Sequence, residues 1–312
     1  MQPWTDTRPP AGRSGPRERK IAAMLAEVVR QLRCPLCAAP FTPSGGALRC
    51  HTGHSFDVAR QGYVNLLPGR PPAGVDSPEM VAARDEVLRA GLFDFLTRAV
   101  VSSARRAAAE AAAETPSDAE PGLIVDVGAG TGHYLAAVLD ALPDRRGIAV
   151  DVAKAAVRRA ARAHPRAVAV VADVWRGLPV ADGCADLLLD IFAPRNAREF
   201  RRALRPRGRL IVVTPGPQHL AELVERLGLL AVDPHKDRRL EETLAGAFRL
   251  DHREDHAQHL SVGPADVTRL VAMGPSAWHV RPDRLAREVA ALPEEVRVTA
   301  AVTLRVYAPT GP

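Results

Sequence analysis

Several features are scarce in this chain of 312 residues, and each scarcity excludes a class of protein. Four cysteines are too few for a disulfide scaffold of this length, so we expect a cytoplasmic protein in which the isolated Cys184 is buried by packing. No run of 18 apolar residues occurs, which excludes an apolar membrane-spanning helix. Residues 1–20 are rich in Pro, Arg and Gly and have no apolar stretch, so we expect a disordered basic tail rather than a secretory signal.

Lysine is also scarce, because 39 of the 42 basic residues are arginine. Codon bias in a GC-rich genome accounts for that ratio, but not for where the positive charge lies. The whole formal net charge of +6 belongs to residues 1–70, which carry ten basic side chains against four acidic ones. The rest of the chain is neutral. Positive charge that is concentrated in one part of a chain predicts a polyanionic partner.

The order of the apolar segments predicts an α/β fold. Residues 79–114 show apolar side chains at helical spacing, and five short runs rich in Val, Ile and Leu follow, separated by helical patterns. These runs cover 123–128, 147–152, 167–173, 186–192 and 208–214. Continuous apolar strands that alternate with helices indicate a mostly parallel sheet covered on both faces. Two alternating segments, 249–262 and 296–307, are expected to add an antiparallel pair at one edge.

Three cysteines and a histidine near the N-terminus have the spacing of a zinc site. Cys34 and Cys37 form one Cys-x2-Cys pair, and Cys50 and His54 form a second pair after a short interval. Two such pairs converge on one tetrahedral Zn²⁺ ion, and four protein ligands leave no position for water, so the expected zinc is structural. His51 adjoins Cys50 and is an alternative ligand, although the spacing favours His54.

A glycine-rich loop follows the first strand of the predicted sheet. Gly128, Gly130 and Gly132 occupy alternate positions, and Asp126 lies two residues before the first of them. Glycine lets the backbone approach a ligand, and the helix that follows offers free N–H groups. Because position 133 is His, the pattern is G-x-G-x-G rather than G-x-G-x-x-G, which favours S-adenosylmethionine over a dinucleotide.

Two further acids follow the next two predicted strands. Asp151 ends the second strand, where a carboxylate can bind ribose hydroxyls, and Asp173 ends the third, near the expected adenine amino group. With Asp126 they lie at the carboxyl ends of three consecutive parallel strands, the edge at which open α/β sheets bind ligands. The alternative is that these acids only cap the helices that follow.

The whole set of motifs resembles the 23S rRNA (guanine-N1)-methyltransferases, which join an N-terminal zinc module to a class I methyltransferase domain. The resemblance extends from about Cys34 to Trp278 and includes the sequence FDVARQGYVNLL at 56–67, directly after the zinc segment. Shorter matches lie at 76–80, 214–220 and 272–279. The zinc knuckle followed by GYVNLL is specific to this family, whereas the glycine loop is common to all class I methyltransferases.

The resemblance implies an enzyme that methylates N1 of a guanine in the hairpin 35 loop of 23S rRNA, with S-adenosylmethionine and structural zinc as cofactors. The family has two types that act on neighbouring guanines. The composition is that of an actinomycete protein, which favours the guanine(748) type over the guanine(745) type. Some members protect macrolide producers from tylosin-like drugs, so antibiotic resistance is the expected role. The expected partner is 23S rRNA, no membrane is expected, and a homodimer is left open.

These expectations divide the chain into five parts. They are the basic tail over 1–20, a zinc-binding RNA-recognition module over 21–67, a linker over 68–78, connecting helices over 79–114, and a Rossmann-like methyltransferase domain over 115–312. The alternative function is a small-molecule methyltransferase with a structural zinc site, which the positive N-terminal part disfavours.

The target base requires its own contacts, because guanine N1 carries a proton at neutral pH and lies on the Watson–Crick edge. We expect the segment around Asp190 to position the base, with Asp190 as proton acceptor, while a purely sheet-terminal role for this acid is an equal alternative. Only 4% of residues are aromatic, so Trp278, Phe192 and Tyr134 are the candidates for stacking on an unpaired base. Core packing is the alternative role for Trp278.

Overall fold

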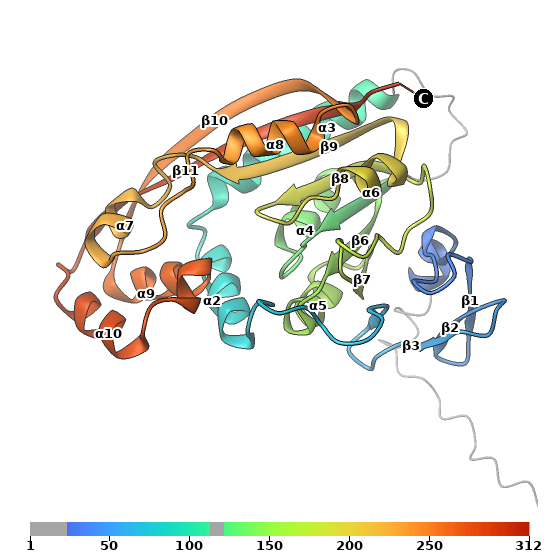
Figure 1. Cartoon of the computed structure of the whole chain (residues 1–312), viewed down its shortest axis with the longest axis horizontal. Helices are drawn as coiled ribbons and strands as arrows, with labels where there is room; N and C mark the ends of the chain where they lie inside the picture. Colours follow the sequence, from blue (N-terminus) through green and yellow to red (C-terminus); the bar gives the residue numbers. More distant parts are fainter. Residues whose placement is uncertain (1–23, 113–121, 312) are drawn as a thin grey trace, which may run out of the picture.

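A computed structural model describes residues 24–112 and 122–311. The predicted tail over 1–20 lies outside the described residues. The centre of the structure is an eight-stranded sheet in the order β10-β11-β9-β8-β5-β6-β7-β4 (Figure 1). Within the described ranges, no helix is long and apolar enough to cross a membrane.

The five predicted apolar strands form the parallel middle of this sheet. Val-, Ile- and Leu-rich runs are buried there because helices cover both faces. The strands are β5 (Leu123–Val127), β6 (Arg146–Asp151), β7 (Ala167–Val171), β8 (Ala185–Ile191) and β9 (Leu204–Pro215), each parallel to its neighbour among them. The predicted class I methyltransferase fold is therefore confirmed.

The predicted antiparallel pair closes one edge of the sheet. β11 (Val296–Pro309) lies between β9 and β10 (Phe248–Val262) and runs antiparallel to both. β11 is almost wholly buried, whereas the outer strand β10 exposes much of its length. The polar residues of the outer strand β10 are therefore exposed at the sheet edge, whereas β11 is covered by its neighbours.

Helices cover the two faces of the sheet unequally. α3 (Asp94–Ala112), α4 (His133–Ala141) and α5 (Lys154–Ala163) contribute to one core with the sheet. α6 (Ala197–Ala203), α8 (Lys236–Leu244) and the zinc segment contribute to the core on the other face. The remaining helices are α2 (Pro78–Arg89), α7 (Ala221–Leu227), α9 (Pro264–Ala272), α10 (Pro282–Ala290) and the 3₁₀ helices η1 (Val29–Gln31) and η2 (Pro275–Trp278).

The zinc segment forms a small antiparallel sheet of its own, and the strand that follows this sheet joins the large one. Its strands are β1 (Phe41–Ser44), β2 (Ala47–Cys50) and β3 (Ser55–Asp57). β4 (Tyr63–Asn65), which we expected inside the zinc module, pairs in parallel with β7 as the edge strand of the large sheet. Three residues are too few to show a strand period in the sequence, so this strand could not be predicted from composition.

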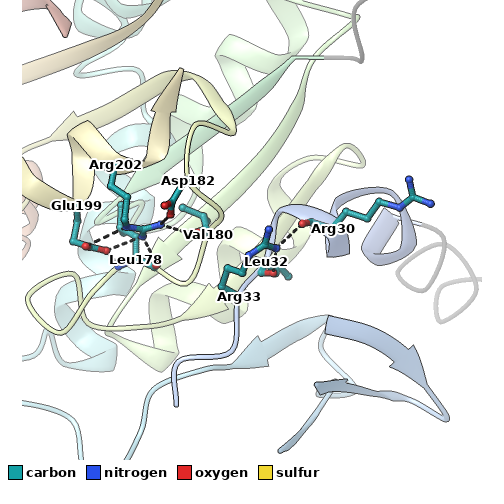
Figure 2. Close-up of polar contacts among 8 residues, drawn as sticks. All are labelled: Arg30, Leu32, Arg33, Leu178, Val180, Asp182, Glu199 and Arg202. Carbon is teal, nitrogen blue, oxygen red and sulfur yellow. Dashed lines mark hydrogen bonds and ion pairs between the residues drawn. The ribbon is translucent and has the colours of Figure 1, made fainter. Parts of the chain in front are cut away.

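The zinc module is fastened to the catalytic domain by backbone hydrogen bonds. The Arg33 N–H donates to Pro179 O at 2.9 Å, and the Ala181 N–H donates to Gln31 O at 2.7 Å. Arg202 holds the segment around Val180, to which the zinc module is bonded. Its guanidinium donates to Val180 O at 2.7 Å and pairs with Glu199 at 2.7 Å (Figure 2). A fixed joint of this kind sets the zinc module at a defined distance from the sheet edge.

Candidate functional site

The four predicted metal ligands come together in the structure. The ligand atoms of Cys34, Cys37, Cys50 and His54 all lie within 4.8 Å of one another. The Sγ atoms of Cys37 and Cys50 are 3.7 Å apart, and His54 Nδ1 is 3.5 Å from the Sγ atoms of Cys34 and Cys50. A tetrahedral zinc site has edges of about 3.8 Å between sulfurs and about 3.5 Å between sulfur and nitrogen, so this donor set fits zinc. His51 is exposed and does not belong to the cluster.

Two tight turns place these ligands. In the first, the Ala38 N–H donates to Cys34 O at 2.8 Å, and in the second the Gly53 N–H donates to Cys50 O at 3.0 Å. Gly53 has φ of +92°, a conformation that glycine adopts without strain. Each turn directs both of its ligands to one side, as the Cys-x2-Cys and Cys-x3-His spacings require.

Thr52 was not singled out from the sequence, but it contacts the same cluster. Its hydroxyl lies 3.0 Å from Sγ of both Cys37 and Cys50. Burial raises the pKa of Cys50, but hydrogen bonds from Thr52 and from backbone N–H groups outweigh this effect and lower the pKa to about 6. The thiolate is the form that binds metal, so Thr52 favours the zinc-binding state. Cys184 lies elsewhere, buried in the core as expected, and burial raises the pKa of its thiol to about 11.

A cavity of about 1050 Å³ opens at the carboxyl ends of the parallel strands. It is lined by all three predicted acids, Asp126, Asp151 and Asp173, and by Gly128 and Gly130 of the glycine loop. The cavity is therefore located at the edge where open α/β sheets bind ligands, and it is larger than a nucleoside alone requires.

All three glycines of the loop have positive φ, and an added Cβ would also meet close neighbours at two of them. A Cβ on Gly128 would lie 2.4 Å from Cβ of Ala193, and a Cβ on Gly132 would lie 3.0 Å from Cα of Ala160. Gly132 does not line the cavity but stands at the N-cap of α4 with φ of +79°. Gly130 has φ of +54° and little around it except the side chain of Arg84.

Asp151 ties the second strand to the glycine loop. One carboxylate oxygen accepts the Gly130 N–H at 2.8 Å, and the other accepts the Ala153 N–H at 2.8 Å. Burial raises the pKa of Asp151, while these two hydrogen bonds favour its ionised form and act in the opposite direction. The side chain is thus held in place at the cavity wall.

The other two acids differ in their surroundings. Asp126 is almost fully buried, and burial together with the charges of Asp151 and Asp190 raises its pKa well above the ordinary value. Asp173 accepts the Trp175 N–H at 3.0 Å and pairs with Arg176 at 3.4 Å. Asp173 therefore fixes a local turn after β7, where the described chain forms no helix for it to cap, and the same side chain lines the cavity.

Asp190 lies behind the cavity rather than in its wall. It is completely buried, its Oδ1 lies 3.2 Å from Nε of Arg195, and it is absent from the residues that line the cavity. Alternation along β8 places Asp190 on the face of Leu188 and Ile191 on the face of the cavity, whereas Phe192 reaches the cavity because its φ of +56° turns the backbone after the strand. Burial raises the pKa of Asp190 to about 8, against the opposing charges of Arg195 and Lys236.

Large exposed apolar side chains gather around the cavity. Phe192, Trp278, Trp175 and Leu230 all line it and are 43%, 52%, 64% and 50% exposed. Trp278 is thus outside the core. Trp175 was not among the sequence candidates, since only its position directly after the third predicted strand could have indicated it. Tyr134 also lines the cavity but is more enclosed.

Phe192 and His219 form an aromatic contact in the cavity wall. Phe192 has φ of +56°, a backbone conformation that is uncommon for a bulky residue and is often found at functional sites. The His219 ring lies between Phe192 and Phe93, with centroid distances of 6.1 Å to each. Burial lowers the pKa of His219 to about 4, so its ring is neutral at neutral pH. His219 lies in a segment that resembled the family, but its role was missed.

The segment expected to be a linker also takes part in the site. Residues 72–76 line the cavity. Arg84 of α2 pairs with Asp76 at 2.6 Å and donates to Met273 O at 2.8 Å, and Arg176 donates to Pro68 O at 2.7 Å. Proline and glycine in this stretch therefore shape a wall of the cavity rather than a free connection.

The cavity fits S-adenosylmethionine. A loop that excludes side chains at Gly128, a fixed carboxylate at Asp151 and a turn at Asp173 follow one another along three adjacent strands. The acidic lining also suits a ligand that carries a positive sulfonium charge.

Two family models match the chain. A zinc-ribbon model described as "RlmA, N-terminal" matches residues 32–70, and one described as "Methyltransferase domain" matches residues 124–208. The first match contains the complete Cys₃His cluster. The second contains the glycine loop and the three predicted acids, Asp126, Asp151 and Asp173.

Three relatives resemble the chain over most of its length. A Micromonospora griseorubida protein described as a 23S rRNA (guanine-N(1)-)-methyltransferase is 52% identical over 92% of this chain and 100% of its own. The 23S rRNA (guanine(748)-N(1))-methyltransferase of Streptomyces fradiae is 51% identical over 92% of this chain and 99% of its own. YxjB of Bacillus subtilis (strain 168), also described as a 23S rRNA (guanine-N(1)-)-methyltransferase, is 32% identical over 81% and 89%. The resemblance therefore includes the zinc segment as well as the α/β domain.

Proposed function

The chain belongs to the 23S rRNA (guanine-N1)-methyltransferase family, and from this premise we propose that it methylates N1 of guanine 748 in the hairpin 35 loop of 23S rRNA. The observation that carries the proposal is the 51% identity over 99% of the length of the Streptomyces fradiae guanine(748) enzyme. The Cys₃His cluster and the acid-lined cavity supply the two sites that such an enzyme needs.

The enzyme is proposed to act in the cytoplasm, where ribosomes are assembled. Within the enzyme, the zinc module is proposed to bind the RNA. Arg30, Arg49 and Arg60 are exposed on it, and Leu36 at the tip of the first knuckle is 55% exposed. Arginines contact phosphates, and an exposed apolar tip can pack against an unpaired base. The hydrogen-bonded joint at Arg33 and Ala181 fixes the distance from this module to the cavity, which suits recognition of one loop on a folded hairpin.

The target guanine is proposed to enter the cavity from its aromatic rim. Guanine N1 is reachable only when the base is unpaired, and the exposed rings of Phe192 and Trp278 offer stacking surfaces at the opening. Phe192 follows the strand end directly, so we assign it the contact closest to the reacting atom and Trp278 a contact at the rim. His219 supports Phe192 from behind and is held neutral by burial.

The chemistry requires a methyl donor, a positioned base and the loss of one proton. Bound S-adenosylmethionine supplies an electrophilic methyl group. Asp126, Asp151 and Asp173 hold the donor at the sheet edge, and the loop at Gly128 allows it to approach the backbone. Asp190 is buried behind the wall, so in this proposal it positions Arg195 and does not accept the proton.

Transfer of a tritiated methyl group from S-adenosylmethionine to 23S rRNA tests the proposal. We expect incorporation of one methyl group per molecule into unmethylated 23S rRNA and into a hairpin 35 fragment, and 1-methylguanine as the labelled nucleoside after digestion. A labelled nucleoside other than 1-methylguanine, or no incorporation, would contradict the proposal.

Protection from tylosin-like macrolides is the proposed physiological role. Support comes from the resemblance to the guanine(748) type, since some members of this family protect macrolide producers. We expect a macrolide-sensitive actinomycete that expresses the chain to tolerate more tylosin than one that expresses the Gly130→Arg variant. Equal sensitivity of the two strains, with guanine methylation present in the first, would separate the enzymatic activity from resistance.

A further inference from the structure

One cationic side chain in the cavity has no partner of its own. Lys236 is the first residue of α8 and lines the cavity. The other arginine or lysine in the described lining is Arg84, which is engaged by Asp76 at 2.6 Å and by Met273 O at 2.8 Å. Over residues 24–112 and 122–311, the Lys236 ammonium forms neither an ion pair nor a side-chain hydrogen bond, so its charge is available to a ligand.

The residue after Lys236 fixes the start of this helix. Asp237 pairs at 2.5 Å with Arg305, which is completely buried on β11, and Arg305 donates to Thr214 Oγ1 of β9 at 3.1 Å. Arg305 is buried although Asp237 is 41% exposed, so loss of Asp237 would leave the Arg305 charge uncompensated inside the protein. The first turn of α8 is therefore anchored to the sheet through Asp237. This anchor holds Lys236 at the cavity, while the Lys236 ammonium itself is not used in the anchor.

Lys236 lines the cavity together with Phe192, which directly follows β8, and with His219. The Lys236 charge influences the pKa of Asp190 on β8 and of His219, whose ring contacts Phe192. Lys236 and Phe192 thus line the same cavity, into which the target base is proposed to enter.

The charged groups that face Lys236 come from several elements. Burial and Arg195 lower the pKa of Lys236, while Asp190 and Asp237 oppose them. Asp233 also lines the cavity, but it pairs with Arg239. Asp237 is committed to Arg305, and burial raises the pKa of Asp190 to about 8, so neither carboxyl fully neutralises the ammonium at neutral pH.

The reaction creates negative charge at one predictable atom. When guanine N1 loses its proton, the negative charge is shared between N1 and the carbonyl oxygen O6, because both belong to one conjugated amide. A fixed cation beside O6 stabilises this charge in a site that excludes much of the water. It does so without taking part in the proton transfer.

We propose that Lys236 is a catalytic residue whose ammonium contacts O6 of the target guanine and stabilises the charge that develops there as N1 is methylated. This inference rests on the proposed function and adds a residue to it. The N1–C bond forms as the S–C bond of S-adenosylmethionine breaks, S-adenosylhomocysteine leaves, and the N1 proton passes to water at the open rim beside Phe192 and Trp278. Lys236 keeps its protons throughout.

The test compares single-turnover methylation rates of the full chain and three variants on the hairpin 35 RNA as a function of pH. Lys236→Met should lower the rate at neutral pH by about 100-fold, as expected when a stabilising donor is removed from a developing anion. This loss should shrink as the pH rises, because a growing share of the guanine is already deprotonated without help. Lys236→Arg should restore most of the rate. Arg238→Met removes one exposed charge from the same helix and should match the unsubstituted protein.

Binding of S-adenosylmethionine, measured by calorimetry, should be unchanged in Lys236→Met, since the proposed contact is to the base. A rate and pH profile equal to those of the unsubstituted protein would overturn the role of Lys236. A loss that stays constant with pH and is not rescued by arginine would overturn it as well. Absence of 1-methylguanine with the unsubstituted protein would instead contradict the proposed function, and this inference with it.

Discussion

The carboxylate of Asp151 accepts a hydrogen bond from the backbone N–H of Gly130 at 2.8 Å. This bond joins the end of β6 to the loop that follows β5, which are 21 residues apart in the chain. It holds the proposed ribose-binding carboxylate and the glycine loop in one rigid unit at the cavity wall. The donor-binding part of the site is thus preformed.

Replacing Asp151 tests this unit. We expect Asp151→Ala to weaken binding of S-adenosylmethionine by roughly 30-fold, because hydrogen bonds to a charged group contribute about 2 kcal/mol. Isothermal titration calorimetry measures the change. Asp144→Ala removes an exposed carboxylate outside the cavity and should bind as the unsubstituted protein does. Equal affinity in both variants would argue against a donor contact at Asp151.

The steric cost of a side chain at position 128 can be separated from the cost of its positive φ by comparison with a second glycine. Gly128 and Gly183 have similar φ values of +66° and +55°, but an added Cβ meets Ala193 at 2.4 Å in the first case and nothing within 4 Å in the second. We expect Gly183→Ala to lower the free energy of unfolding by about 1 kcal/mol and Gly128→Ala by roughly 3 kcal/mol. Urea unfolding compares them. Equal losses would show that the close approach to Ala193 is relieved at no cost.

The fourth zinc ligand is tested by two neighbouring histidines. We expect His54→Ala to lose stoichiometric zinc, because Nδ1 completes the tetrahedron with three sulfurs, and His51→Ala to keep it. Metal analysis of the purified variants measures this. Zinc retained by His54→Ala and lost from His51→Ala would reverse the ligand assignment.

The basic N-terminal part gives a prediction about salt. Residues 1–20 carry five basic and two acidic side chains, so their removal takes away a net charge of three. We expect RNA affinity to fall and the slope of log affinity against log salt to decrease in magnitude by about 2, since each phosphate contact releases about 0.7 counterion from single-stranded RNA. Zinc content and donor binding should not change. An unaltered salt slope would show that these residues do not contact the RNA phosphates, and codon bias would then account for the arginines.

The parallel strands could be predicted because each is a buried run of Val, Ile and Leu between turn residues, and the zinc ligands because their spacing reports their geometry directly. β4 could not be predicted, since three residues at Tyr63–Asn65 show no period and gain their strand partner from β7, about a hundred residues later. The hydrogen bond from the Arg33 N–H to Pro179 O could not be predicted for the same reason, because its two residues lie far apart in the chain.

Within the candidate site, the acids at strand ends were predictable because the carboxyl edge of a parallel sheet collects them. The direction in which each side chain points was harder to predict. Asp190 and Phe192 are two residues apart, yet one is buried behind the wall and the other reaches the cavity with φ of +56°. Lys236 is held at the cavity by the ion pair between its neighbour Asp237 and Arg305. These two residues lie in distant segments, and no motif in the sequence indicates that they pair.

The most direct test of the central claim is primer extension on 23S rRNA after incubation with the protein and S-adenosylmethionine. A methyl group on guanine N1 blocks Watson–Crick pairing and stops the polymerase. The account predicts a new stop at guanine 748 in the hairpin 35 loop that requires the donor and disappears with Gly130→Arg. A stop only at guanine 745, or no stop in that loop, would contradict it.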